Sequence, residues 1–231
     1  MFNFVEGEVI LVDKPLEWTS FDVVKKLKFL IQRTSGKKKI KLGHAGTLDP
    51  LASGLLVLCS GKKTKQIPRI QEAEKEYIGE FYLGATTASY DLESEPENFK
   101  SIDHLKIEDL RAVAKELSGA IMQRPPLFSA KKVQGTRAYK LARKGSDLQL
   151  EPKAIVINQF ELSKINFPLV EFKIRCSKGT YIRSIAHDFG QELKTGAYLK
   201  SLRRTAIGDF KVSDAKGIEE WVELISSSTV D

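Results

Sequence analysis

Cysteine is scarce in this 231-residue chain, and its placement argues against the sites that cysteine usually builds. The two cysteines, Cys59 and Cys176, each lie inside an apolar stretch and lack the CxxC or Cys/His spacing of a zinc site. A disulfide would require the fold to bring these two distant positions together. We therefore expect two buried free thiols rather than a metal site or a disulfide.

Long hydrophobic runs and a targeting segment are also missing. No apolar run approaches the roughly 20 residues that a membrane-spanning helix requires. The first eight residues, Met1 to Glu8, carry two acidic side chains and no cation, unlike the start of a secretory leader. Because hydrophobic content is 42% and charged content 29%, as in ordinary soluble domains, we expect a cytoplasmic protein with no membrane contact.

The motifs of several enzyme classes are absent as well. The chain has no P-loop, no HExxH helix and no paired-aspartate metal site, and it shows no internal repeat. These absences argue against an aspartate-dependent phosphotransferase or hydrolase, which is one alternative for a catalytic carboxylate.

Positive charge is in excess, with 37 lysines and arginines against 30 acidic residues and a net charge of +7. The cations gather in segments that we expect to be loops or element edges: 37–41, 62–65, 131–144 and 203–204. Cations clustered in this way could bind the phosphate backbone of a nucleic acid. An ordinary solvated protein surface would also carry some of these charges.

Hydrophobic periodicity predicts an α+β fold with a mixed, largely antiparallel sheet. Strict alternation of apolar and charged residues over 170–176 indicates a strand with one buried face. Thr19 and Asp22 form a capping box at the start of a helix that ends near Gly36. The expected strands are 9–12, 77–83, 155–162, 170–176 and 202–212, and the expected helices are 20–36, 105–117, 181–193 and 218–225.

Residues 124–145 stand apart as a basic insertion with aromatic residues between its cations. The segment opens with two prolines and Phe128 and continues through Lys131 to Tyr139 and Arg143. Such interleaving suits stacked bases and phosphates.

The most informative stretch runs from Gly43 to Gly54 and reads GHAGTLDPLASG. Asp49 stands between glycine-rich backbone and a proline, so it is displayed on a tight loop, as a nucleophile would be. The alternative is a turn in which Asp49 bonds its own backbone ahead of Pro50.

Six fragments, taken in order, resemble the bacterial tRNA pseudouridine-55 synthase (TruB) family over residues 9 to 210. They are DKP with TS at 13–20, the GHAGTLDPLASG stretch, EY at 76–77, PP with SA at 125–130, KGTYIR at 178–183 and LRRT at 202–205. The resemblance implies a pseudouridine synthase fold: a central sheet flanked by helices, with residues 124–145 as a thumb that grips RNA. It implies one catalytic domain over residues 1–231, with 211–231 as a tail too short for the C-terminal PUA module of many members.

The resemblance also implies the reaction, which converts uridine 55 in the TΨC loop of tRNA to pseudouridine without cofactor or metal. The target base is stacked inside a folded loop, so it must be flipped out at a cost of about a few kcal/mol. The implied partner is the T-arm of tRNA, bound by a monomer that needs no obligate protein partner.

Catalytic roles follow residue by residue from the matched motifs. Asp49 matches the catalytic aspartate, and Arg183 matches the cation that holds this carboxylate ionised. Tyr77 matches a tyrosine that stacks on the target base and handles a proton, and His44 matches a histidine that pries the nucleotide from its stack. Without the motifs, Tyr77 would be interpreted as a core residue, Arg183 as a surface cation and His44 as a loop residue that caps nearby backbone.

Further residues are assigned to substrate binding by the same resemblance. Tyr181 and Leu202 are expected to wall the uracil pocket, although both positions also suit ordinary packing residues. The residues expected to contact the RNA are Lys14, Phe128, Lys131, Arg203 and Arg204. His104 and His187 match no motif, and we expect both to face solvent or to be bonded locally.

One further alternative stays open at this stage: an RNA-binding protein that keeps the scaffold without the catalytic activity. Intact Asp49, Tyr77 and Arg183 favour the enzyme.

Overall fold

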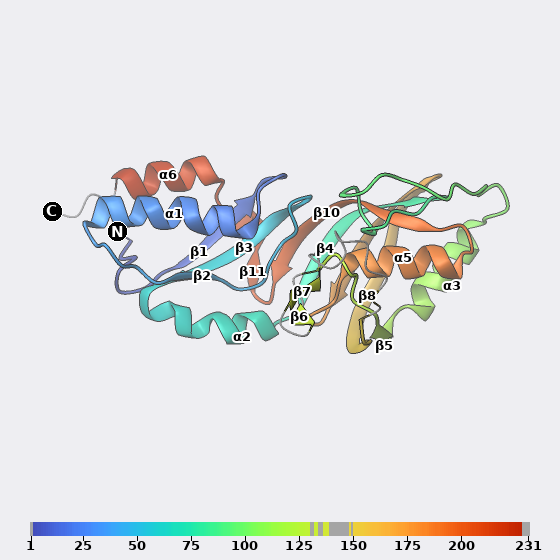
Figure 1. Ribbon diagram of the computed structural model, residues 1–231, viewed down its shortest axis with the longest axis horizontal. Coiled ribbons are helices and arrows are strands. Elements are labelled where there is room, and N and C mark those ends of the chain that lie inside the picture. The colour runs from blue at the N-terminus through green and yellow to red at the C-terminus, as the bar shows by residue number, and fades with distance from the viewer. Residues whose placement is uncertain (1, 130–131, 134–135, 139–147, 149, 228–231) are drawn as a thin grey trace. The chain divides into compact units, whose positions relative to one another are not determined.

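The computed structural model describes residues 2–129, 132–133, 136–138, 148 and 150–227 (Figure 1). The chain forms two compact units. Unit 1 consists of Met1–Tyr77 and Leu202–Asp231, and unit 2 consists of Ile78–Ser201. The boundaries fall inside strands β4 (Lys75–Leu83) and β10 (Ala197–Ile207), so each of these strands contributes residues to both units.

Unit 1 is built around strand β3 (Ala52–Ser60), whose residues are almost all buried. Strand β1 (Val9–Lys14) and the short β2 (Leu42–His44) pair with β3 antiparallel. Strand β10 pairs in parallel with the first three residues of β3. In that parallel register Leu202 lies beside Ala52 and Arg204 beside Gly54. The remaining elements of the unit are η1 (Gly61–Gln66), α2 (Ile67–Glu72), β11 (Phe210–Lys211) and η2 (Val212–Asp214), besides two longer helices.

Helices α1 (Ser20–Ser35) and α6 (Ile218–Ser227) lie side by side in unit 1 (Figure 1). Thr19 caps α1 through the capping box with Asp22, and Gly36 ends it in the left-handed conformation, φ 65°. Both helices share one apolar cluster with β1 and β3, and Trp221 adds a hydrogen bond of 2.8 Å from its indole N–H to the carbonyl of Leu11. This packing fixes the first turn of α1 in unit 1.

Unit 2 contains strands β5 (Gly119–Gln123), β8 (Lys153–Asn166) and β9 (Leu169–Cys176), paired antiparallel in the order β5-β8-β9. In the described part of this unit lie helices α3 (Ile107–Glu116) and α5 (Ile182–Glu192), and the short strands β6 (Lys132–Val133) and β7 (Thr136–Arg137) pair antiparallel. Stacked rings of Phe81 and Phe172, 4.2 Å apart, and the neighbouring ring of Phe189 fill its core.

The sequence prediction of an α+β fold with a mixed sheet is confirmed, and so are the buried free thiols of Cys59 and Cys176. Strand β10, however, begins five residues before the expected start at residue 202. The reason is that α5 ends in a turn at Gly196, φ 76°, whose N–H bonds the carbonyl of Gly190, so the chain becomes extended immediately afterwards. In the described part of the chain, no helix combines the length and apolar character needed to cross a membrane.

Candidate active site

The Asp49 loop is anchored in unit 1 by the first residue of α1. The hydroxyl of Ser20 accepts a hydrogen bond from the N–H of Leu48 at 2.8 Å and donates one to its carbonyl at 3.2 Å. Ser20 is 2% exposed, so water does not compete for these bonds. The N–H of Ala52 closes the next turn on the carbonyl of Asp49 at 3.1 Å, and the half-buried Asp49 side chain stands on this fixed backbone.

Arg204 holds the same loop from strand β10. Its Nε donates to the carbonyl of Leu55 at 2.8 Å, Nη2 to that of Gly46 at 3.0 Å and Nη1 to that of Thr47 at 3.4 Å. The residue is 1% exposed. Because the guanidinium of Arg204 donates to three backbone carbonyls, it stabilises the conformation of the loop. A role of Arg204 in RNA binding stays a prediction.

Gly54 makes the close approach of β3 and β10 possible. Its φ is +100°, and a Cβ at this position would lie 2.3 Å from the carbonyl oxygen of Arg204. A side chain there would push the two backbones apart. The glycine that ends the GHAGTLDPLASG stretch is thus required by the strand pairing that brings Arg204 to the loop.

Lys14 at the end of β1 is fully buried under the loop. Its Nζ donates to the carbonyls of Trp18 at 2.6 Å, Pro15 at 2.8 Å and Pro50 at 3.4 Å. Burial lowers the pKa of Lys14 to about 8, the carboxylate of Asp49 acts in the opposite direction, and Arg204 lowers the pKa further. Lys14 therefore places a buried positive charge where it interacts with Asp49.

A depressed pKa of Lys14 has a measurable effect on stability. From pH 8 to 10.5 the unfolded chain keeps a proton on Lys14 that the folded chain has lost, so the free energy of unfolding rises with pH across this window. Below pH 8 both states are protonated, and the cost of burying the charge is fully present. We expect the difference in unfolding free energy between wild type and Lys14→Met to grow by on the order of 1–3 kcal/mol in favour of wild type from pH 7 to pH 10.

Urea unfolding at the two pH values measures this difference. Lys26→Met, which removes an exposed lysine of α1, serves as the control and should show no such growth. Parallel pH profiles for wild type and Lys14→Met would contradict the prediction.

The other predicted residues of unit 1 have distinct surroundings. His44, in β2, is half-buried, and burial lowers its pKa against an opposing contribution from the backbone of Gly46. Tyr77 is 9% exposed on the buried face of β4, and Leu202 is half-buried. Arg203 forms a two-bond ion pair with Asp13, with distances of 2.6 and 3.0 Å. Its role in RNA binding stays a prediction.

In unit 2, Arg183 occupies the first turn of α5 and is 4% exposed. Its Nε lies 3.5 Å from Oδ2 of Asp91, which is 5% exposed, and its Nη1 donates to the carbonyl of Ser89 at 3.2 Å. The interpretation of Arg183 as an ordinary surface cation is therefore wrong, because a buried guanidinium needs specific partners. The sequence does not predict Asp91 as a partner of Arg183, because Asp91 lies in an acidic loop without periodicity.

Tyr181 is the residue that precedes α5, and the side chain of Gln123 fixes its backbone. The N–H of Tyr181 donates to Oε1 of Gln123 at 2.8 Å, and its carbonyl accepts from Nε2 at 3.0 Å. Gln123 is 1% exposed, and no sequence signal had singled it out. Phe128 is half-buried, whereas Lys131 and half of the predicted thumb, residues 124–145, lie outside the described residues.

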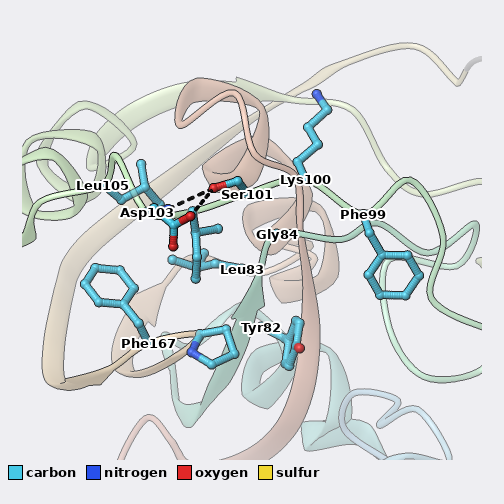
Figure 2. Close-up of a pocket in the computed structure, with 11 residues that line it drawn as sticks. Tyr82, Leu83, Gly84, Phe99, Lys100, Ser101, Asp103, Leu105 and Phe167 are labelled. Carbon is cyan, nitrogen blue, oxygen red and sulfur yellow. Dashed lines mark hydrogen bonds between the residues drawn. The ribbon is translucent and has the colours of Figure 1, made fainter.

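Unit 2 also contains an open pocket of about 660 Å³ that involves none of the predicted site residues (Figure 2). Its walls include the rings of Tyr82, Phe99 and Phe167, and the hydroxyl of Ser101 donates to Asp103 at 2.8 Å. Among the described residues, no group of three or more histidine, cysteine or acidic side chains could hold a metal ion.

Solved structures share this fold. The chain matches a chain of a Cbf5-Nop10-Gar1 complex with a TM-score of 0.72 and 29% identity, covering 95% of this chain and 54% of that one. It also matches an H/ACA RNP bound to a substrate RNA containing 2'-deoxyuridine, with a TM-score of 0.69, 27% identity and the same coverages. The chain thus spans about half the length of these structural relatives. Together with the displayed aspartate, the fold defines a pseudouridine synthase.

The family is settled by sequence. The family described as "TruB family pseudouridylate synthase (N terminal domain)" matches residues 32–182, and the chain belongs to it. A protein of Phocaeicola vulgatus named tRNA pseudouridine synthase B is 47% identical over 229 residues, which cover 99% of this chain and 97% of that protein. One of the same name from Flavobacterium johnsoniae is 49% identical, with coverages of 96% and 98%.

Proposed function

We propose that this chain is a tRNA pseudouridine synthase that isomerises the uridine at position 55 of the TΨC loop. Membership of the TruB family supports the reaction class, and near full-length relatives named tRNA pseudouridine synthase B support the tRNA substrate. The observation that carries the proposal is the fixed loop that displays Asp49 above the buried charge of Lys14.

Asp49 is the catalytic residue in this proposal. The reaction breaks the N1–C1′ glycosidic bond and rebuilds it from C5, so it needs a group that adds to the base or sugar or takes a sugar proton, and a carboxylate can do each. The buried ammonium of Lys14 interacts electrostatically with the Asp49 carboxylate. Because Ser20 and Arg204 fix the backbone of the loop, the carboxylate is positioned before the base arrives.

The remaining roles follow the family motifs. Arg183 is the ionic partner of Asp49, and Tyr77 stacks on the flipped base and handles a proton. His44 displaces the base from its stack. An uncharged imidazole suits insertion between stacked bases, and the lowered pKa of His44 favours this uncharged form at pH 7. Tyr181 and Leu202 wall the uracil pocket. Arg203 and the thumb residues Phe128 and Lys131 contact the RNA.

The proposal includes the organisation of the protein. We propose a cytoplasmic monomer that binds the T-arm through a catalytic domain with a thumb at 124–145. It acts without an obligate protein partner, cofactor or metal ion.

The test is to incubate the purified chain with an in vitro transcribed tRNA and to map pseudouridine by carbodiimide-primer extension and mass spectrometry. We expect one pseudouridine, at position 55, formed equally well in EDTA. A transcript with cytidine at position 55 is the matched control and should gain none. Absence of product, or product only at other positions, would overturn the proposal.

A further inference from the structure

Two aromatic rings in unit 2 stack beside the Arg183–Asp91 ion pair. The ring of Tyr90 lies 4.0 Å from that of His187, centroid to centroid, with an angle of 16° between the planes. His187 had been expected to face solvent or to be bonded locally, but it is half-buried, and its Nδ1 is buried with no hydrogen-bond partner in the described part of the chain. The ring of this half-buried histidine therefore contacts the face of a tyrosine ring.

Tyr90 reaches this position through an unusual backbone. Its φ is +66°, a conformation that bulky residues seldom adopt and that costs on the order of a tenfold factor in population or more. Its N–H bonds the carbonyl of Thr87 at 3.2 Å, and its carbonyl accepts from the N–H of Leu199 at 2.9 Å. These backbone bonds tie the loop to itself and to β10, whereas the ring stack ties it to α5.

The stack and the ion pair join the same two segments of the chain. Arg183 and His187 are four residues apart on α5, so their side chains leave one face of the helix one turn apart. Their partners are sequence neighbours, because Asp91 pairs with Arg183 and Tyr90 stacks on His187. Ser89, whose carbonyl accepts from Arg183, completes the contact. Any shift of the loop along α5 would thus disturb both contacts together.

We propose that Tyr90 and His187 are positioning residues, which hold the loop of residues 87–94 against α5 so that Asp91 and Ser89 fix the Arg183 guanidinium for the isomerisation. The inference rests on the proposed function, in which Arg183 assists catalysis. Neither ring needs to touch the RNA, because each acts through the ion pair. A loss of the stack should therefore slow the chemical step without weakening substrate binding.

Single-turnover kinetics on the tRNA transcript tests this inference. We expect Tyr90→Ala and His187→Ala each to lower the rate of pseudouridine formation about tenfold, a factor equivalent to about 1.4 kcal/mol in the barrier. The Kd for the transcript should stay within about twofold. The double variant should be no slower than either single variant, because both remove one interaction.

Conservative variants separate positioning from a merely structural role. His187→Phe and Tyr90→Phe keep two stacked rings and should recover most of the rate. The matched control is Tyr82→Ala, which removes another stacked tyrosine pair of unit 2, Tyr82 with Tyr198, at 5.1 Å and 17°. This control should lower the melting temperature without changing the single-turnover rate.

Three results would overturn the inference: unchanged rates in both alanine variants, equal slowing in Tyr82→Ala, or no recovery in the phenylalanine variants. If the alanine variants fail to fold, Tyr90→Leu and His187→Leu replace them, and the same changes in single-turnover rate and Kd are expected. A wild-type chain that forms no pseudouridine would instead overturn the proposed function, so the two failures are distinguishable.

Discussion

Replacing Asp49 with asparagine is expected to lower the single-turnover rate of pseudouridine formation by at least about 10³-fold while leaving the affinity for tRNA within a few-fold of wild type. The change keeps the shape of the side chain and removes only its charge and nucleophilicity. Binding should persist, because the cations that meet phosphate are untouched. Rates come from tritium release or primer extension, and affinities from filter binding.

The exposed carboxylate of Asp209 provides the control for this experiment. Asp209→Asn removes an acidic charge from the same unit and should be as active as wild type. An Asp49→Asn variant that forms pseudouridine at the normal rate would refute the catalytic assignment. One that loses tRNA binding in parallel with activity would show that Asp49 serves binding rather than chemistry.

The second large effect is expected at Arg183. Arg183→Met should lower the free energy of unfolding by about 3–5 kcal/mol, because the carboxylate of Asp91 then stays at 5% exposure without its guanidinium partner. The same variant should be close to inactive. Urea unfolding and single-turnover rates measure the two losses separately.

A double variant separates stability from catalysis at this position. Arg183→Met with Asp91→Asn removes the buried charge together with its partner, so most of the lost stability should return. The activity should not return, since the cation is still missing. Recovery of activity in the double variant would show that Arg183 matters only as the counter-ion of Asp91.

Local patterns were enough to predict much of the fold. The alternation that predicts strand 170–176 and the capping box of Thr19 depend on residues close in sequence, and both are present in the structure. Strand β5 was not predicted, because its five residues lack alternation and are mostly exposed, and its pairing with β8 creates it. The start of β10 was likewise misplaced, because the turn at Gly196 follows from the end of α5.

The supporting residues of the site were harder to predict than the residue displayed on the loop. Asp49 stands in a motif that can be identified from the sequence, but the surroundings of Lys14 and Arg204 depend on strand pairings between distant segments. Both residues were expected to meet RNA, yet their charged groups bond carbonyls of the protein itself. Gln123, Asp91 and the Tyr90–His187 stack gave no signal, since each depends on a contact between segments that are far apart in sequence.

The bonds that Arg204 makes have a bearing on how the catalytic loop can evolve. Its guanidinium bonds main-chain carbonyls of residues 46, 47 and 55, and every amino acid supplies the same carbonyl. The exposed side chain of Thr47 is therefore free to drift without altering the path of the loop. Part of the information that shapes this short peptide therefore resides some 150 positions downstream, in the single side chain of Arg204.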